Sequence, residues 1–205
     1  MPAPTPYIAG IIVAGGQSSR MQFRDKALMP LGGRSVIEHI IDNAKEQASP
    51  LLINVNRHPD RYKRFGLPLI PDPFGPEAGP LAGILAAMEY CQEQGCADVL
   101  ACFPGDVPWF PQDLVKQLEG LRVKEDTQVC YARTAGQWQP LFSVWSLTLL
   151  PVLRQALADQ LYSPMMLIRS LPHSMLDLEH PAPGHFANLN TPEDLVQAQS
   201  RLQSL

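Results

Sequence analysis

The sequence lacks the features that place a chain in a membrane or carry it out of the cell. No apolar run in its 205 residues approaches the roughly 18–20 residues that a membrane-spanning helix requires. Residues 1–6 have neither the basic start nor the apolar stretch of a signal peptide. We therefore predict a cytoplasmic protein that binds no membrane, with residues 1–6 forming a flexible tail.

Charge and cysteine are also sparse. The formal net charge is −4 and charged residues make up 18% of the chain, a balance that gives no support to general binding of nucleic acid. The cysteines contain no C-x-x-C pair and match no zinc-ligand spacing. We expect all of them to be small hydrophobes in a reducing compartment, namely Cys91, Cys96, Cys102 and Cys130.

Alternating strand and helix patterns run along the whole chain. Apolar runs predict strands at residues 7–14, 51–55, 67–70, 98–103, 129–133, 141–145 and 175–178. Helical spacing predicts helices at residues 35–48, 80–93, 111–121, 147–160 and 163–171, and Thr191 caps a last helix. This order predicts an α/β fold: a single Rossmann-like, three-layer domain over residues 1–205 with a mostly parallel central sheet.

Ligands of such sheets bind beyond the carboxyl ends of the strands, which directs attention to the segment after the first strand. Gly15 and Gly16 tolerate φ values that bring backbone N–H groups close to an anion. Arg20 and Lys26 add positive charge. The segment is neither a G-x-x-x-x-G-K-[ST] loop nor a G-x-G-x-x-G loop. A glycine pair alone is usually a turn, but its spacing to Arg20 and Lys26 predicts a phosphate-binding loop over residues 15–26.

This loop resembles the signature L-x-G-G-x-x-x-R-M-G, followed within a few residues by a lysine, of a nucleotidyltransferase family that includes sugar-phosphate transferases. Within that family the chain is most similar, over nearly its whole length, to the molybdenum cofactor guanylyltransferases. Further segments match in the same order: N-V-N-R-H at 54–58, Asp72 followed by G-P-L-A-G at 79–83, P-G-D-V-P at 104–108 and N-L-N-T-P-E at 188–193. The chain departs from the signature at Gln22, where the family has glycine, and at Val13, where it has leucine.

The resemblance implies a fold of the nucleotide-diphospho-sugar transferase type and a specific reaction. GMP would pass from GTP to the phosphate of molybdopterin or molybdenum cofactor, giving the guanine dinucleotide form and pyrophosphate. Magnesium, with manganese as a second candidate, would be held by Asp106. Transient contacts with other cofactor-biosynthesis enzymes and client molybdoenzymes fit the same role.

Site residues follow from the matching segments. The resemblance implies catalytic roles for Arg20, Lys26 and Asp106. It implies nucleotide contacts for Val13, Ala14, Gly15, Gly16, Lys26, Asn54, Asn56, Asp72, Gly79, Pro80 and Leu81. It implies acceptor contacts for Arg57, His58, Asn188 and Asn190.

Each of these residues also has a purely structural interpretation. Asp72 and Asp106 can be turn residues, and Asn54 or Asn56 can be structural. Arg57 and His58 can belong to a solvated loop. We expect Trp138, Phe142 and Trp145 in the core, with stacking on a pterin as the alternative for Trp138. No role is assigned to His39, His173, His180 or His185.

Three other functions remain open from the sequence. The sister class uses CTP and makes the cytosine dinucleotide, and a sugar-phosphate nucleotidyltransferase usually needs a longer chain. A weakly catalytic homologue that binds nucleotide or cofactor is the third, and Gln22 is the feature that favours it. If Gln22 instead leaves the loop functional but suboptimal, Gln22→Gly is expected to tighten GTP binding or raise kcat.

Overall fold

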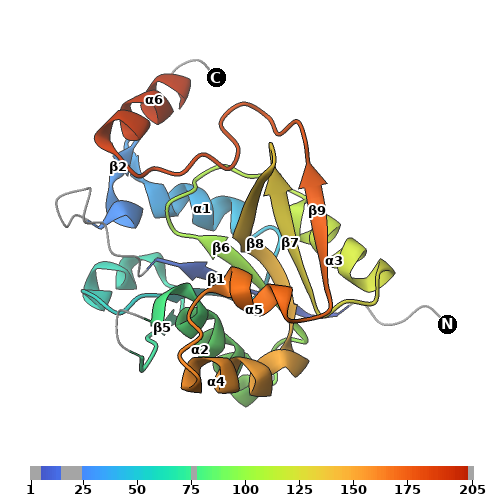
Figure 1. Cartoon of the computed structure of the whole chain (residues 1–205). Coiled ribbons are helices and arrows are strands. Elements are labelled where there is room, and N and C mark those ends of the chain that lie inside the picture. Colours follow the sequence, from blue (N-terminus) through green and yellow to red (C-terminus); the bar gives the residue numbers. More distant parts are fainter. Residues whose placement is uncertain (1–5, 15–24, 75–77, 203–205) are drawn as a thin grey trace.

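The computed structural model describes residues 6–14, 25–74 and 78–202 of the chain. Most of the expected N-terminal tail and residues 15–24 of the expected phosphate loop, including Gly15, Gly16, Arg20 and Gln22, lie outside these ranges. The described chain forms a seven-stranded sheet in the order β5-β4-β1-β6-β8-β7-β9 (Figure 1). The strands are β1 (Ile8–Val13), β4 (Leu51–Asn54), β5 (Leu69–Ile70), β6 (Val99–Pro104), β7 (Val129–Thr134), β8 (Gln137–Ser146) and β9 (His173–Leu178).

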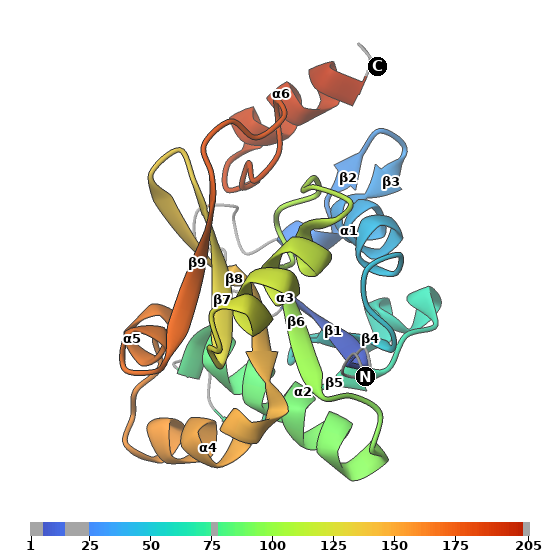
Figure 2. The ribbon, with the colours of Figure 1, turned by 90° about the vertical axis from the view of Figure 1, so that its right-hand side faces the viewer.

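Helices cover both faces of this sheet. The α-helices are α1 (Val36–Ala44), α2 (Gly79–Gln94), α3 (Leu114–Lys124), α4 (Leu150–Ala158), α5 (Pro164–Arg169) and α6 (Pro192–Leu202). Short 3-10 helices are η2 (Lys26–Leu28), η3 (Pro59–Arg61), η4 (Lys63–Phe65) and η6 (Leu147–Leu149), and a small hairpin joins β2 (Pro30–Leu31) to β3 (Arg34–Ser35). Figures 1 and 2 show α2, α4 and α5 on one face of the sheet and α1 and α3 on the other.

Strand β1 lies in the interior of the sheet, and its side chains are apolar on both faces. It pairs in parallel with β4 on one side and β6 on the other. Ala9 and Ile11 are buried beneath the helices α2 and α4, whereas Ile12 is buried beneath α1. Continuous apolar runs are typical of parallel strands that are covered twice.

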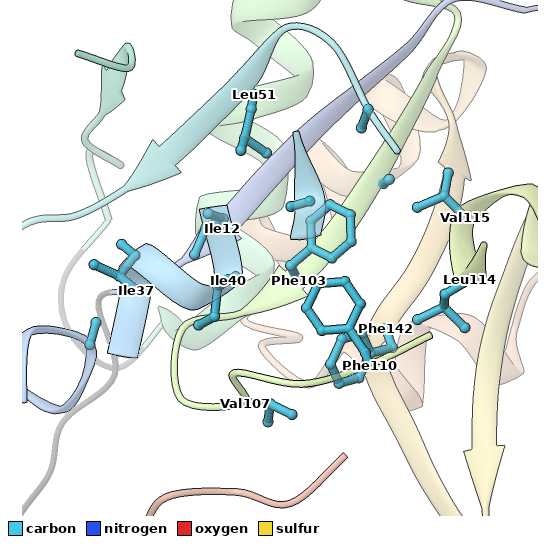
Figure 3. Packing of buried hydrophobic residues seen from close by; sticks show 14 of the residues in the cluster. Ile12, Ile37, Ile40, Leu51, Phe103, Val107, Phe110, Leu114, Val115 and Phe142 are labelled. Carbon is cyan, nitrogen blue, oxygen red and sulfur yellow. The ribbon is translucent and has the colours of Figure 1, made fainter. Parts of the chain in front are cut away.

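The core on the α1 and α3 face is built around a group of aromatic rings. Phe103 stacks on Phe110 with ring centroids 5.3 Å apart, and Phe110 contacts Phe142 at 5.2 Å (Figure 3). Phe142 also meets Phe186 edge to face at 4.9 Å. Because Phe186 precedes α6, this cluster ties the C-terminal segment to the loop that follows β6.

Strand β8 runs antiparallel to both of its neighbours. The β7–β8 turn at Ala135 and Gly136 therefore lies at the edge where the parallel strands end. The pairing of β7 with β8 shifts register between Tyr131 and Ala132, so the β8 residues that follow Gln139 bulge before Ser143. This hairpin extends the sheet beyond the end of β6 (Figure 2).

The strand and helix pattern predicted from the sequence is confirmed, as is the mostly parallel sheet. The short hairpin at 30–35 was not predicted, and β8 begins earlier than expected, at Gln137. Phe142 and Trp145 are buried as predicted, but the core assignment of Trp138 is wrong, since its side chain is 50% exposed. Of the cysteines, Cys96 is half-buried and the rest are buried. Within the described residues, no helix has both the length and the apolarity to cross a membrane.

Candidate active site

The carboxyl ends of β1, β4 and β6 are held together by backbone hydrogen bonds. The Ala14 N–H donates to the Asn54 carbonyl at 3.0 Å, and the Gly105 N–H donates to the Val13 carbonyl at 2.9 Å. Gly105 is required at this contact, because a Cβ there would lie 2.8 Å from the Ala14 Cα and from the Val13 oxygen. Side chains that follow these strands therefore gather at one edge of the sheet.

Lys26 brings three distant segments together at this edge. Its Nζ donates to Asn190 Oδ1 at 2.5 Å and lies 3.7 Å from Asp106 Oδ2. Lys26 begins η2 after the first strand, Asp106 follows β6, and Asn190 precedes α6. The side chains of Lys26 and Asp106 are 20% and 28% exposed, so both remain open to a ligand. Lys26 and Asp106, the two predicted catalytic residues that lie within the described chain, are therefore close together.

The Asp106 carboxylate lies in a poorly solvated place. Burial raises the pKa of the Asp106 carboxyl above its ordinary value, and the nearby Lys26 ammonium offsets part of that rise. A carboxylate that is poorly solvated by water gains more from a cation that binds it. Among the described residues no group of three or more His, Cys, Asp or Glu side chains is arranged to hold a metal. A lone carboxylate suits Mg²⁺, which usually takes one or two carboxylates and completes its shell with phosphate oxygens and water.

The segment before α6 is locked against the Asp106 loop. The Leu189 N–H donates to the Asp106 carbonyl at 2.9 Å. Asp194 Oδ2 accepts from the N–H groups of Asn190 and Thr191 at 2.9 and 2.8 Å, and Thr191 Oγ1 accepts from the Asp194 N–H at 3.1 Å. This reciprocal cap, predicted at Thr191 from the sequence, fixes the backbone of the residue that binds Lys26.

A second polar group lies one strand beyond β1, where Asn54 and Asn56 hold Asp72. Asn54 Nδ2 donates to the Ile70 carbonyl at 2.9 Å and to Asp72 Oδ2 at 3.2 Å. Asn56 Nδ2 donates to the same oxygen at 2.7 Å, and Asn56 Oδ1 accepts from the Asp72 N–H at 2.9 Å. The three side chains therefore form one unit, in which Asn54 is only 2% exposed.

Helix α2 begins beside this unit. A Cβ on Gly83 would lie 2.4 Å from Asn54 Oδ1, so glycine is what allows the asparagine to pass under the first turns of the helix. Gly79 is exposed with φ +59° and Pro80 is half-buried, whereas the Leu81 side chain is fully buried. Leu81 can therefore meet a ligand only through its backbone.

Comparison with known proteins gives this geometry a context. The MobA-like NTP transferase domain matches residues 10–175. The chain belongs to this family. It is 35% identical to a molybdenum cofactor guanylyltransferase of Mesorhizobium japonicum over 202 residues, which cover 97% of each chain.

Solved structures share the fold of this MobA-like protein. Molybdopterin-guanine dinucleotide biosynthesis protein A of Archaeoglobus fulgidus superposes with a TM-score of 0.79 at 18% identity, covering 96% of this chain and all of that one. A Mycobacterium tuberculosis protein crystallised in complex with manganese superposes with a TM-score of 0.64 at 16% identity, over 95% of this chain and 98% of the other.

The remaining predicted residues of the MobA-like chain are more dispersed. Arg57 and His58 are exposed and follow β4, next to Asn56, whereas Asn188 and Asn190 lie beside the Asp106 loop. No hydrogen bond or ion pair among the described residues joins the two pairs. Asn188 is exposed.

The sequence did not predict some residues that hold the site residues in place. Tyr62, fully buried, donates its hydroxyl to Asp25 Oδ1 at 2.7 Å, directly before Lys26. Burial, with a smaller contribution from the bond to Asp25, raises the pKa of Tyr62, so the hydroxyl remains a donor. No local sequence pattern predicts this contact, because the two residues are 37 positions apart. Gly83 could have been found, because a glycine inside a helix often marks a close approach.

Proposed function

We propose that this protein transfers GMP from GTP to the terminal phosphate of molybdopterin or of its molybdenum-bearing form, giving the guanine dinucleotide form of the cofactor and pyrophosphate. The observation that carries the proposal is the meeting of Lys26, Asp106 and Asn190 at the carboxyl edge of the sheet. Membership of the MobA-like family and 35% identity to a curated guanylyltransferase support it.

Lys26 and Asp106 are placed for phosphate chemistry. The Lys26 ammonium would neutralise charge on the triphosphate, and we assign the same role to Arg20 of the glycine-containing loop with Gly15 and Gly16. Asp106 would hold Mg²⁺, or Mn²⁺ in its place. When bound, the divalent ion would supply positive charge that offsets the negative charge of the reacting phosphates.

The nucleoside end of GTP is assigned to the β4 and β5 side. Asn54 and Asn56 hold the Asp72 carboxylate in one orientation, where it can accept hydrogen bonds from the ribose or the base. The first turn of α2 offers the backbone N–H groups of Gly79 and Leu81, which have no partner inside the helix, and Pro80, which has no N–H, lies between them. Val13 and Ala14 complete this half from the end of β1.

The reaction needs no covalent intermediate with the enzyme. An oxygen of the acceptor phosphate attacks the α-phosphorus of GTP and forms a new P–O bond. The bond between the α-phosphorus and the oxygen that bridges to the β-phosphorus breaks. Pyrophosphate leaves with the electron pair of that bond. A phosphate monoester is already anionic near neutral pH, so no general base is required. Catalysis then rests on orientation and charge neutralisation by the residues around Asp106.

The acceptor is assigned to the β6 side of the edge, with Asn188 and Asn190. Arg57 and His58 were predicted for the acceptor, but their place after β4 favours contact with the nucleotide. We further propose that residues 1–205 act as one nucleotidyltransferase domain in the cytoplasm, on small molecules and not on nucleic acid or membranes, with transient contacts to partner biosynthetic enzymes and client molybdoenzymes.

A turnover assay tests the proposal. Purified protein with GTP, Mg²⁺ and molybdopterin is expected to release pyrophosphate and form the guanine dinucleotide, and CTP at the same concentration is expected to react far more slowly. Product from CTP alone would reassign the chain to the cytidylyl class. Binding of GTP or molybdopterin without product from either nucleotide would contradict the enzyme assignment and favour a binding homologue.

A further inference from the structure

Trp138 differs from the other tryptophans in its surroundings. Trp145 is fully buried and donates its Nε1–H to Ser143 Oγ at 2.8 Å, and Trp109 is half-buried against His39. Trp138 is 50% exposed, near the turn of the β7–β8 hairpin. The core does not account for its position, since a ring of this size is usually buried over most of its area.

One face of the Trp138 ring is occupied by a cation. The Arg169 guanidinium carbon, at the end of α5, lies 4.3 Å from the ring centroid. Among the described residues Arg169 makes no ion pair with a carboxylate, whereas Arg133, opposite Trp138 on β7, is paired with Asp177 of β9. The guanidinium therefore packs against the ring and, within the described part of the chain, has no carboxylate paired with it.

The register of the strands places this pair beside the candidate active site. Cys102 of β6 and Tyr131 of β7 both lie level with Ser143 of β8. Trp138 pairs with Arg133, two residues beyond Tyr131, or about 7 Å further towards the carboxyl edge. β8 is the strand next to β6, so the Trp138 backbone lies near the level where β6 ends, just before Asp106.

The ring also lies on the relevant face of the sheet. Tyr131 belongs to the cluster under α2 and α4, and side chains two residues apart on a strand share a face. Arg133 and its partner Trp138 are therefore on the face that carries α2, where Asn54 passes under Gly83. The Asp72 group follows β5 and Trp138 lies on β8, so in the strand order the two lie on either side of β1 and β6.

We propose that Trp138 and Arg169 form a stacking platform for the flat, fused ring system of the acceptor. This inference rests on the proposed function, because it supposes an acceptor whose phosphate is held near Asp106 and whose ring lies further along the edge. A pterin is flat and rich in heteroatoms, so an indole held in place by a guanidinium offers it a matching surface at little cost in side-chain order.

Binding and kinetics with molybdopterin and GTP test the platform. Removing an aromatic side chain that stacks on a nucleobase raises the dissociation constant about tenfold or more. We expect Trp138→Ala to raise the Kd and KM for molybdopterin by about that factor, and Trp138→Phe to restore most of the affinity. Arg169→Ala is expected to act in the same direction. The Kd for GTP should be unchanged in each variant.

Tyr7→Ala is the matched control, since Tyr7 is an exposed aromatic residue just before β1, at the amino ends of the parallel strands and away from Asp106. Equal affinity for molybdopterin in wild type and Trp138→Ala would overturn the platform while leaving guanylyl transfer intact. An equal loss of GTP affinity would also overturn it. A wild type that binds molybdopterin through Trp138 but transfers no GMP would support the platform and refute the proposed function. Wild type that binds no molybdopterin would refute both.

Discussion

At the scale of single residues, Asp106 shows a conflict between stability and chemistry. Burial raises the pKa of its carboxyl, with only partial compensation from Lys26. The folded protein therefore disfavours the ionised form that a cation would need. A group whose folded pKa lies above its unfolded pKa lowers stability once the pH exceeds the unfolded value of about 3.9. For a carboxylate, this is the reverse of the usual ion-pair effect.

Asp106→Asn is accordingly expected to fold, to lose magnesium-dependent transfer by roughly 100-fold or more, and to lose no stability. In EDTA at pH 7 its melting temperature should equal or exceed that of wild type. The difference should shrink towards pH 4 and below, where the wild-type carboxyl is protonated. Thermal unfolding across this pH range and a pyrophosphate-release assay measure both effects. A folded variant with near wild-type turnover would refute the metal assignment.

Gly83 gives a second residue-scale prediction. Glycine inside a helix normally costs up to about 1 kcal/mol relative to alanine. At Gly83 the added Cβ would meet the amide of Asn54, which is fixed by bonds to Ile70 and Asp72. Gly83→Ala is therefore not expected to bring the stability that alanine normally adds to a helix. It should also weaken GTP binding, because the new Cβ displaces Asn54 from Asp72.

Gly120 of α3 is the matched control, because a Cβ there meets nothing within 4 Å. Gly120→Ala should stabilise the protein by about 0.5–1 kcal/mol and leave GTP affinity unchanged. Urea unfolding and GTP titration of both variants provide the measurement. If the two glycine variants gain stability alike, the close approach at Asn54 does not constrain the helix.

At the scale of elements, the cap of α6 connects helix stability to the site. Burial opposes ionisation of Asp194, but its bonds from the backbone of Asn190 and Thr191 and the more distant Lys26 leave the pKa of Asp194 below its ordinary value. A lowered folded pKa contributes stability above the unfolded pKa, and that contribution is lost as the pH falls through the folded pKa. The same bonds orient Asn190 towards Lys26.

Asp194→Asn should thus cost about 1 kcal/mol at pH 7. The cost should diminish as the pH falls below about 4, where the wild-type carboxyl begins to protonate. Transfer should also slow, because Asn190 is less well held. Chemical unfolding of both proteins at neutral and acidic pH checks the trend. A cost that is the same at every pH would show that the charge of Asp194 plays no part in the cap.

At the scale of the whole molecule, the sheet divides the site into two halves. β1, β4, β5 and α2 supply the side proposed for the nucleotide, whereas β6, β7, β8 and α6 supply the side proposed for the acceptor. Both halves depend on the backbone bonds that join Ala14 to Asn54 and Gly105 to Val13. A ligand bound across these strands stabilises the fold as a unit.

GTP with Mg²⁺ is expected to stabilise the folded protein by about 2.7 kcal/mol at a concentration 100 times its Kd. For a chain of this length that is a rise in melting temperature of roughly 5–10 °C. CTP and ATP at the same concentration should give smaller shifts. Differential scanning fluorimetry with the three nucleotides measures the preference, and a larger shift with CTP would contradict the guanine assignment.

The sequence predicts some of these features and not others, for a physical reason. Strands and helices are predictable because their periodicity is local, and the cap at Thr191 is readable within a few residues. The bond from Lys26 to Asn190 joins residues 164 positions apart, and the contact of Tyr62 with Asp25 depends on how η3 and η4 fold back. Trp138 was misassigned because its exposure depends on where the hairpin ends, which no local pattern records.

The reversed direction of β8 has a consequence for how such a protein can diversify. Because β8 alone runs against its neighbours in the sheet, the β7–β8 turn at Ala135 and Gly136 lies at the carboxyl ends of the parallel strands. The two strands that it joins are not among those proposed to bind the nucleotide. Residues can be inserted or exchanged at this turn without disturbing β1, β4 or α2. Grafting this turn between homologues should therefore change the preference for the acceptor while the preference for GTP is kept. Acceptor choice could then evolve through changes in this hairpin alone.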